Sequence, residues 1–159
     1  MDTIHVPIKS YYALTEKVDF EKLTEAAYQD GTPTVVDGQL VNGDFTEVGH
    51  SRFLIFDNGK RMLETILQKD QHTFLLELTQ IELSLRKLAH RARVRFSYSD
   101  LEGGSTIVHW TYAFEHKNFI ARGMLRRFLK KKHQYWMRNF LSELKRQMES
   151  YHTSAHSSK

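Results

Sequence analysis

The stretch IVHWTYAF at residues 107–114 alternates large apolar side chains with smaller or more polar ones. Alternation with a period of two predicts a β-strand that buries one of its faces. The inward residues would be Val108, Trp110, Tyr112 and Phe114. A long segment with helical patterning follows and ends near Tyr151. We therefore expect an α+β fold in which a curved antiparallel sheet of roughly six or seven strands wraps around one long C-terminal helix.

The C-terminal segment carries a stripe of apolar and aromatic residues at three- and four-residue spacing, as a helix that packs against a sheet requires. The stripe comprises Leu125, Leu129, His133, Trp136 or Met137, Phe140, Leu144 and Met148. Residues 152–159 are small and polar, which is typical of a frayed terminus. We predict a single domain over residues 1–151 and a disordered polar tail over 152–159.

The rest of the chain supplies the remaining strands of the expected sheet. Strand-like patterns cover residues 3–8, 48–56, 60–68, 73–78, 91–99 and 106–115. Asp57-Asn58-Gly59 is typical of a tight hairpin turn. A helix is predicted over residues 18–28, with Asp19 as its N-cap. Two glycine-containing turns should break residues 37–44 into short pieces, and periodicity does not decide between helix and strand for residues 80–90.

Length and composition indicate one folded domain. The chain has 159 residues, of which 40% are hydrophobic and 12% aromatic, and domains commonly hold roughly 100 to 200 residues. Its apolar runs are much shorter than the roughly 20 residues that a membrane span needs. The chain has no cysteine, which excludes disulfides and thiolate chemistry, and its first residues lack the pattern of a secretion signal. We expect a cytoplasmic protein without a transmembrane segment.

Charge is distributed unevenly along the chain, although the net charge is only +4. Residues 1–82 hold 7 basic and 14 acidic residues (−7), whereas residues 83–159 hold 16 and 5 (+11). No acidic residue lies between Glu115 and Glu143. The basic residues there are Lys117, Arg122, Arg126, Arg127, Lys130, Lys131, Lys132 and Arg138. They could contact an anionic surface, or they could form the solvated face of a helix beside an acidic neighbour.

Several short motifs resemble those of the START-like (SRPBCC, helix-grip) superfamily, in particular its polyketide cyclase/dehydrase-like branch. VDFEKL at residues 18–23 resembles the helix after the family's first strand, and VGHSR at 48–52 resembles its Gly-x-x-Arg strand opening. LETIL at 63–67 and GSTIVHW at 104–110 resemble later strands. The usual tryptophan of the first helical region is missing at residues 10–14, and the Trp-x-Pro that members often show is missing at 25–27.

The resemblance implies a cavity between sheet and helix that holds a hydrophobic or amphipathic small molecule or lipid. Its candidate lining residues are Arg52, Leu54, Phe56, Met62, Glu64, Leu76, His90, Phe96, Trp110, Tyr112, Leu129, His133 and Trp136. On the family register Arg52 and Glu64 point inward from neighbouring strands. A two-residue turn at Asn58-Gly59 would instead turn Glu64 outward, because a slip of one residue inverts every side chain. We favour the inward pair, which could hold a ligand's polar end or be a structural ion pair.

Signatures of enzymes are mostly absent from the sequence. It contains no phosphate-binding loop, no Gly-x-Ser-x-Gly elbow and no zinc helix, so we predict no metal and no cofactor. The sequence favours a binding protein. An aromatic cyclase or dehydratase is the alternative, with Arg52 stabilising an enolate and Glu64 or His133 acting as acid and base. A third hypothesis is that the basic C-terminal helix docks on an anionic partner such as ribosomal RNA or a membrane.

Overall fold

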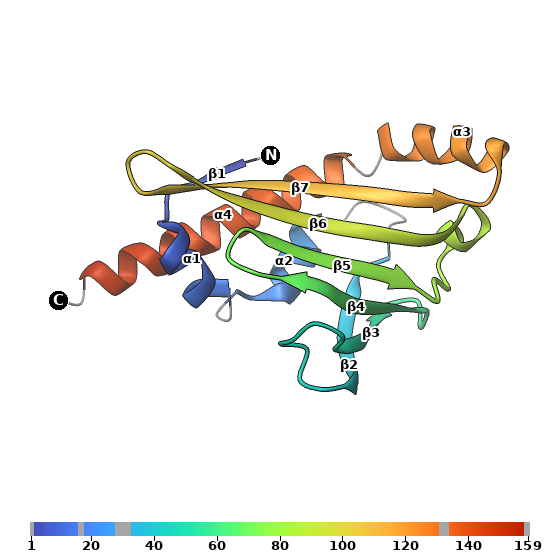
Figure 1. Ribbon diagram of the computed structural model, residues 1–159, viewed down its shortest axis with the longest axis horizontal. Coiled ribbons are helices and arrows are strands. Elements are labelled where there is room, and N and C mark those ends of the chain that lie inside the picture. The colour runs from blue at the N-terminus through green and yellow to red at the C-terminus, as the bar shows by residue number, and fades with distance from the viewer. Residues whose placement is uncertain (1, 16–17, 28–32, 131–133, 158–159) are drawn as a thin grey trace.

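The computed structural model describes residues 2–15, 18–27, 33–130 and 134–157. Its strands form one seven-stranded antiparallel sheet in the order β1-β7-β6-β5-β4-β3-β2 (Figure 1). The strands are β1 (Asp2–Ile4), β2 (Val35–Asn42), β3 (Ser51–Phe56), β4 (Arg61–Lys69), β5 (Thr73–Thr79), β6 (Ala89–Leu101) and β7 (Ser105–His116). Consecutive strands from β2 to β7 are neighbours, and β1 adds to the far side of β7, as the predicted meander requires.

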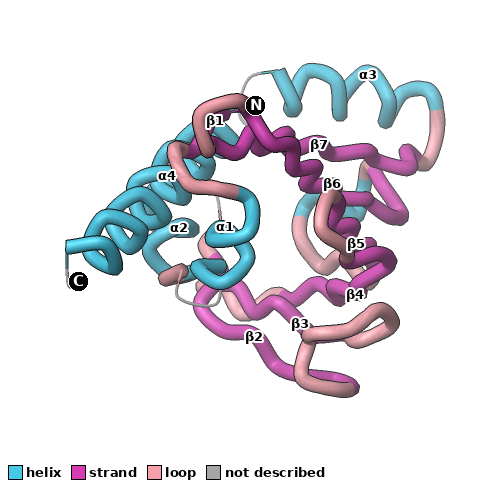
Figure 2. The backbone as a smooth tube through the Cα atoms, turned by 60° about the vertical axis from the view of Figure 1, so that its left-hand side comes forward, coloured by secondary structure: helices cyan, strands magenta, loops and turns pink. Residues whose placement is uncertain are grey.

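The helices α1 (Ile8–Thr15), α2 (Phe20–Ala27) and α4 (Gln134–Ser157) cover the concave side of this sheet (Figure 2). The structure also contains α3 (Phe119–Phe128) and a short 3-10 helix, η1 (Ser84–Lys87), before β6. α4 contacts α1, α2 and β1, whereas α3 lies against β7 at the periphery. The α+β architecture predicted from the sequence, a curved antiparallel sheet with a long C-terminal helix, is therefore confirmed.

The alternation that predicted the two longest strands is present in the structure. Ala92, Val94 and Tyr98 of β6 are buried, whereas Arg93 and Arg95 are exposed. On β7, Val108 and Trp110 are buried in the same way, while His109 and Thr111 are exposed. Phe96 lies opposite Trp110 and Val94 opposite Tyr112, so both strands present their large side chains to the same concave face.

Bulges bend the sheet. The register shifts between Ile66 and Gln68 on β4, and again between Ala89 and Arg91 on β6. A bulge adds an unpaired residue to one strand and increases the local bend and twist. These irregularities help the sheet to curve around the concave side on which α4 lies (Figure 2).

The C-terminal segment differs from its prediction, because it forms two helices and not one. α3 ends at Phe128 and α4 begins at Gln134. Leu125 is buried on α3, whereas Phe140, Leu144 and Met148 are buried on α4. The apolar spacing stays in phase through the connection, so the periodicity could not reveal a change of direction there.

α4 also continues to Ser157, through residues that the sequence assigned to a polar tail. The hydroxyls of Thr153 and Ser154 donate to the carbonyls of Glu149 and Ser150. Such bonds to the residue four positions earlier allow Thr and Ser to remain in a helix. Small polar residues therefore did not mark the end of this helix.

In the N-terminal half the predicted cap of α2 and the turn at Gly43-Asp44 are confirmed, whereas the other predicted glycine turn is wrong. Asp19 caps α2, because its Oδ1 accepts a hydrogen bond from the backbone N–H of Lys22. The Asp37-Gly38 turn is absent, since β2 runs unbroken through both residues. Register shifts near both ends of β2 absorb the irregularity that we expected to break the strand.

The core lies between the concave face and α4. Met148, Val108, Ile4 and Val6 are fully buried there. The Thr106 hydroxyl, also fully buried, donates a 2.7 Å hydrogen bond to the Val6 carbonyl and thereby ties the connection between β1 and α1 to β7. The core does not fill the whole space between the sheet and the helices. Two hollows remain there.

Candidate functional site

Two adjoining pockets lie between the concave face and the helices. The inner pocket has a volume of about 400 Å³ and reaches from β3 and β4 to α4. The outer pocket has a volume of about 390 Å³ and lies nearer to η1 and the end of α3. Both pockets share lining residues: Thr24, Val35, Phe56, Met62, Leu78, Tyr112 and Trp136. The two volumes are therefore neighbouring compartments of one site.

Aromatic side chains form the wall of the inner pocket next to α4. The Trp110 ring stacks on Phe96 with centroids 4.9 Å apart, and it contacts Phe140 at 4.7 Å and Trp136 at 5.1 Å. Trp110 is almost fully buried, and its indole N–H has no acceptor among the described residues. The wall is aromatic and apolar, and it contains a hydrogen-bond donor that no described residue satisfies.

One ion pair enters the opposite wall of the inner pocket. The hairpin between β3 and β4 has a three-residue loop in which Gly59 takes a φ of +72°, a conformation that favours glycine. This register places Arg52 directly opposite Glu64, with Nε and Oε2 2.8 Å apart. The inward pair that we favoured is therefore confirmed, and the two-residue turn is wrong.

The two members of this pair differ in exposure. The Glu64 side chain is 8% exposed and the Arg52 side chain 27%. The Arg52 guanidinium also lies 4.0 Å from the ring centroid of Phe45, in the loop between β2 and β3. The cation is thus held from two sides and reaches toward the surface, whereas the carboxylate lies in the interior.

Burial controls the electrostatics of this wall. It raises the pKa of the Glu64 carboxyl above its ordinary value of 4.5, and the neighbouring Arg52 charge opposes that rise. Burial also raises the pKa of the Tyr112 hydroxyl, and the nearby Glu64 charge adds a smaller contribution. Tyr112 therefore stays protonated at physiological pH. The pocket thus combines apolar walls with a carboxyl, a guanidinium and a phenol.

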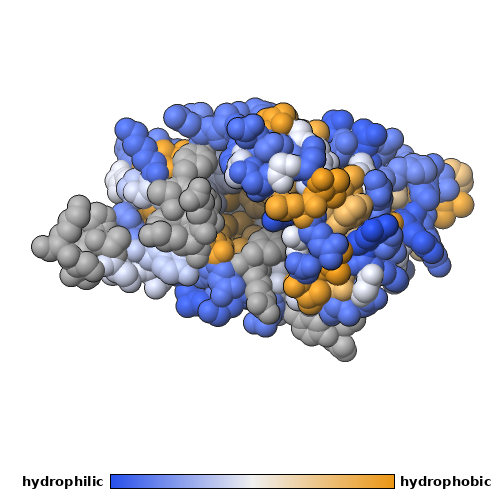
Figure 3. Space-filling model, turned by 90° about the horizontal axis from the view of Figure 1, so that it is seen from below, coloured by the Kyte–Doolittle hydropathy of each residue, from blue (hydrophilic) through white to orange (hydrophobic). Residues whose placement is uncertain are grey.

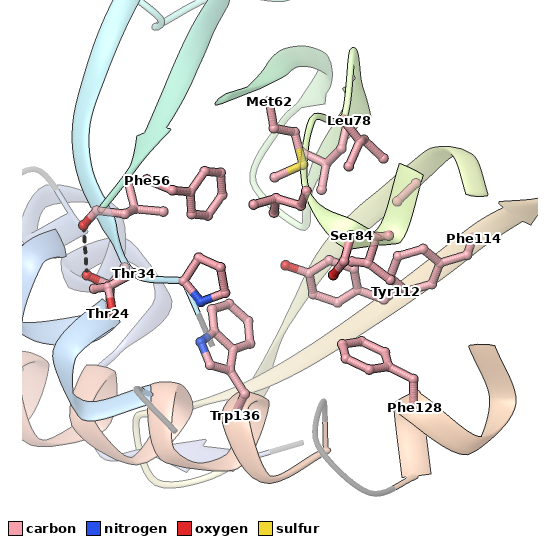
Figure 4. Close-up of a pocket in the computed structure, with 16 residues that line it drawn as sticks. Thr24, Thr34, Phe56, Met62, Leu78, Ser84, Tyr112, Phe114, Phe128 and Trp136 are labelled. Atoms are coloured by element: carbon pink, nitrogen blue, oxygen red, sulfur yellow. Dashed lines mark hydrogen bonds between the residues drawn. The ribbon is translucent and has the colours of Figure 1, made fainter. Parts of the chain in front are cut away.

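The outer pocket is bordered by elements from distant parts of the chain. Figure 4 shows Trp136 projecting from α4 and Phe128 from α3, with Phe56, Met62 and Tyr112 on the sheet side. The Thr24 hydroxyl donates a 3.4 Å hydrogen bond to the Val35 carbonyl and links α2 to the start of β2. In Figure 3 the surface of the molecule is hollowed, with apolar side chains in and around the hollow.

The structure brings together all but three of the site residues predicted from the sequence. His90 was expected to face inward with Ala92, but it lies at the bulge between Ala89 and Arg91 and is exposed. Leu129 is half-buried beside the end of α3 and does not line either pocket. His133 lies outside the described residues.

Sequence reasoning missed the contribution of three other segments. Thr24 and Leu23 enter from α2, Leu83 and Leu85 from the segment around η1, and Phe128 from the end of α3. The only signal for Leu83 and Leu85 was their ambiguous apolar spacing. Thr24 shows that one small polar residue on an amphipathic helix can line a site without any distinctive pattern.

The described part of the chain contains no group of three or more His, Cys, Asp or Glu side chains arranged to hold a metal ion. Its helices are also too short or too polar to cross a bilayer.

No family model and no curated protein matches the sequence, but solved structures match the fold. Ginseng major latex-like protein 151 from Panax ginseng has a TM-score of 0.61 and 17% identity, covering 95% of this chain and 93% of its own. A Thermus thermophilus protein has a TM-score of 0.60 and 19% identity, covering 94% of both chains. Ara h 8.0201 has a TM-score of 0.54 and 17% identity, and the match covers 89% of this chain and 94% of that protein.

The chain has the START-like helix-grip fold. The match spans nearly the whole of each chain, so it includes the sheet, the helices beneath it and the C-terminal helix. The helix-grip fold thus confirms the architecture that the short motifs indicated. At these identities the likeness concerns the fold alone, and function has to be argued from the site.

Proposed function

We propose that the protein binds a hydrophobic or amphipathic small molecule or lipid between the sheet and α4. The observation that carries this proposal is the pair of adjoining apolar pockets, whose volumes of about 390 and 400 Å³ fall within the usual range for ligand sites. An apolar ligand body would replace water along Phe56, Met62 and Leu78. Burial of that surface would drive binding.

Arg52, Glu64 and Tyr112 would orient the ligand's polar end. The Arg52–Glu64 pair already neutralises itself at 2.8 Å, so a neutral hydroxyl or carbonyl group would bind there without displacing either charge. The unused indole N–H of Trp110 marks a further place where a ligand oxygen would satisfy a buried donor. These groups favour a ligand with a long apolar body and one compact polar end.

Filling the site should remove binding. Met62 lines both compartments, so Met62→Trp should lower the affinity for a fluorescent apolar probe such as anilinonaphthalene sulfonate by at least roughly tenfold. Val48→Trp adds an indole at a residue that is 59% exposed and serves as the matched control. Native mass spectrometry of the purified protein should also detect a copurified ligand.

Two results would count against this proposal. One is a folded Met62→Trp variant, with a near-ultraviolet spectrum and unfolding transition like those of the wild type, that binds the probe as tightly as the wild type. The other is a wild-type protein that binds no apolar probe and carries no ligand.

A cyclase or dehydratase activity of the polyketide type is the second candidate. The observation that favours it is a buried carboxyl with a raised pKa beside Arg52, because burial that raises the pKa of a carboxyl makes its anion a stronger base. The Glu64 carboxylate would take the proton from the carbon next to a carbonyl, and Arg52 would stabilise the resulting enolate. The Glu64 carboxyl would then return that proton to the β-hydroxyl, which leaves as water as the carbon–carbon double bond forms. If Glu64→Gln folds normally and still converts a poly-β-ketone at the wild-type rate, Glu64 is not the acid or base.

A further inference from the structure

We propose that α3 is an interfacial helix that docks the protein onto a bilayer containing anionic phospholipids. Only part of the apolar side of α3 packs against the sheet, and the rest is exposed. Ala121 and Leu125 are buried against β7, whereas Ile120 and Met124, one turn apart beside them, are 60% and 56% exposed. Phe119, at the start of the helix, is 82% exposed.

Basic side chains lie on the same helix and next to it. Arg122, Arg126 and Arg127 are exposed on α3, and Lys117 and Lys130 flank it. None of these five forms an ion pair with an acidic side chain in the described part of the chain. Within that part of the chain, no acidic side chain therefore neutralises these five charges through an ion pair.

This combination fits a lipid surface better than it fits a nucleic acid. A helix that lies in a membrane interface buries large apolar side chains among the acyl chains and keeps Lys and Arg near anionic headgroups. RNA would use the arginines but would gain little from Ile120 and Met124. A second exposed apolar surface, on β2, includes Val36 and Val41. It lacks this partnership, because residues 35–48 contain three acidic residues and no Lys or Arg.

The position of α3 connects docking with the pockets. α3 lies at the periphery in both views (Figure 1 and Figure 2). Its last residue, Phe128, nevertheless lines the outer pocket (Figure 4). A bilayer beneath α3 would therefore lie beside that compartment. Membrane docking does not depend on the proposed ligand binding. Exchange of a lipid between the bilayer and the outer pocket would depend on it, because the pocket would then have to bind that lipid.

Sedimentation with lipid vesicles tests the charged part of this surface. The wild type should bind phosphatidylcholine vesicles that contain phosphatidylglycerol, bind pure phosphatidylcholine weakly, and lose binding as salt rises. Reversing three charges with Arg122→Glu, Arg126→Glu and Arg127→Glu should lower partitioning roughly a hundred-fold or more. The matched control makes the same change in net charge elsewhere, at exposed side chains: Lys9→Glu, Lys60→Glu and Arg95→Glu.

A second pair of variants tests the apolar part. Ile120→Ser with Met124→Ser should lower partitioning roughly tenfold or more while leaving the net charge unchanged. Val36→Ser with Val41→Ser, at side chains that are 59% and 54% exposed, is the matched control and should bind like the wild type.

Three outcomes would overturn membrane docking. The first is a wild type that ignores anionic vesicles, and the second is binding that survives both sets of α3 variants. The third is vesicle binding that needs the arginines but not Ile120 and Met124, because α3 would then adsorb by charge alone and would not act as an interfacial helix. Probe binding in solution is measured separately on the same variants and should be unchanged. A failure of the pocket is thus distinguishable from a failure of docking.

Discussion

Glu64 occupies a position where its negative charge is costly. Its side chain is 8% exposed, and its described partner is the Arg52 guanidinium. A buried pair of this kind adds little net stability, but removing one member leaves a buried charge alone. Arg52 reaches the surface and tolerates such a loss better than Glu64 would. The two members of the pair therefore differ, and protonation of the Glu64 carboxyl is the change that relieves the cost of its buried charge.

This asymmetry predicts a pH dependence of stability. Because the folded state raises the pKa of Glu64 above 4.5, it binds the proton more tightly than the unfolded chain does. The free energy of unfolding should therefore fall as pH rises from about 4.5 through the raised pKa, and change no further from this group above it. Glu64→Gln has no proton to lose, so its stability relative to wild type should improve across this window.

Urea unfolding at several pH values measures that difference. The comparison has to be made between variant and wild type, because the pKa values of Asp44, Asp70 and Glu143 are lowered and their effect on stability has the opposite sign. Glu102→Gln, in an exposed turn, is the control. A stability difference between Glu64→Gln and wild type that stays constant over the whole range would contradict the prediction.

Sequence reasoning at this scale succeeded where side chains alternate regularly and failed where the backbone departs from regularity. Arg52 and Glu64 were placed correctly on the register that the family resemblance implied, because their strands pair without interruption, although the turn sequence alone left two registers open. His90 was not, because a bulge between Ala89 and Arg91 turned it outward. A bulge leaves no reliable signature in a sequence, since it depends on how two strands are strained against each other.

Between elements, one buried side chain joins α2 to α4. The Gln147 amide accepts a 2.8 Å hydrogen bond from the Asp19 N–H and donates one of 3.3 Å to the Asp19 carbonyl. Gln147 is 5% exposed, so these bonds are protected from water. They connect the start of α2 with the helix that supports the pocket floor.

Replacing this amide should weaken the whole domain. Gln147→Met keeps the length of the side chain but removes both bonds to Asp19 and a third bond, of 3.0 Å, that the amide donates to Glu143 Oε1. We expect the free energy of unfolding to fall by about 1–3 kcal/mol. The same change at Gln39, which is exposed on β2, should alter it by less than about 0.5 kcal/mol. Urea unfolding followed by circular dichroism measures both. Equal effects of the two substitutions would show that the hydrogen bonds of the Gln147 amide contribute nothing to stability.

The elements themselves were predicted unequally. β6 and β7 were predicted almost to their ends, because one face is buried along most of their length. The separation of α3 from α4 was missed, since Leu125 and Phe140 fit one continuous stripe although they pack in different places. The periodicity of a helix indicates which of its sides is apolar, but it does not indicate which element packs against that side. The exposed Ile120 and Met124 became visible only in the structure.

At the scale of the whole molecule, ligand and stability are linked. A ligand that binds only the folded state stabilises it by about 2.7 kcal/mol at a concentration one hundred times its Kd. For a chain of this size, a saturating pocket ligand should therefore raise Tm by roughly 5–10 °C. Differential scanning fluorimetry of the protein before and after extraction of bound lipid measures the shift. An extracted protein with an unchanged Tm would indicate that nothing had occupied the pocket.

The hollow interior has a mechanical consequence as well. Unfolding removes internal voids, so proteins with imperfectly filled interiors shrink in total volume when they unfold. Hydrostatic compression should consequently denature the ligand-free form more readily than a form whose two compartments are filled. A bound ligand would fill these voids and reduce the volume lost on unfolding. The pressure at which the protein unfolds would therefore show whether the pockets are occupied.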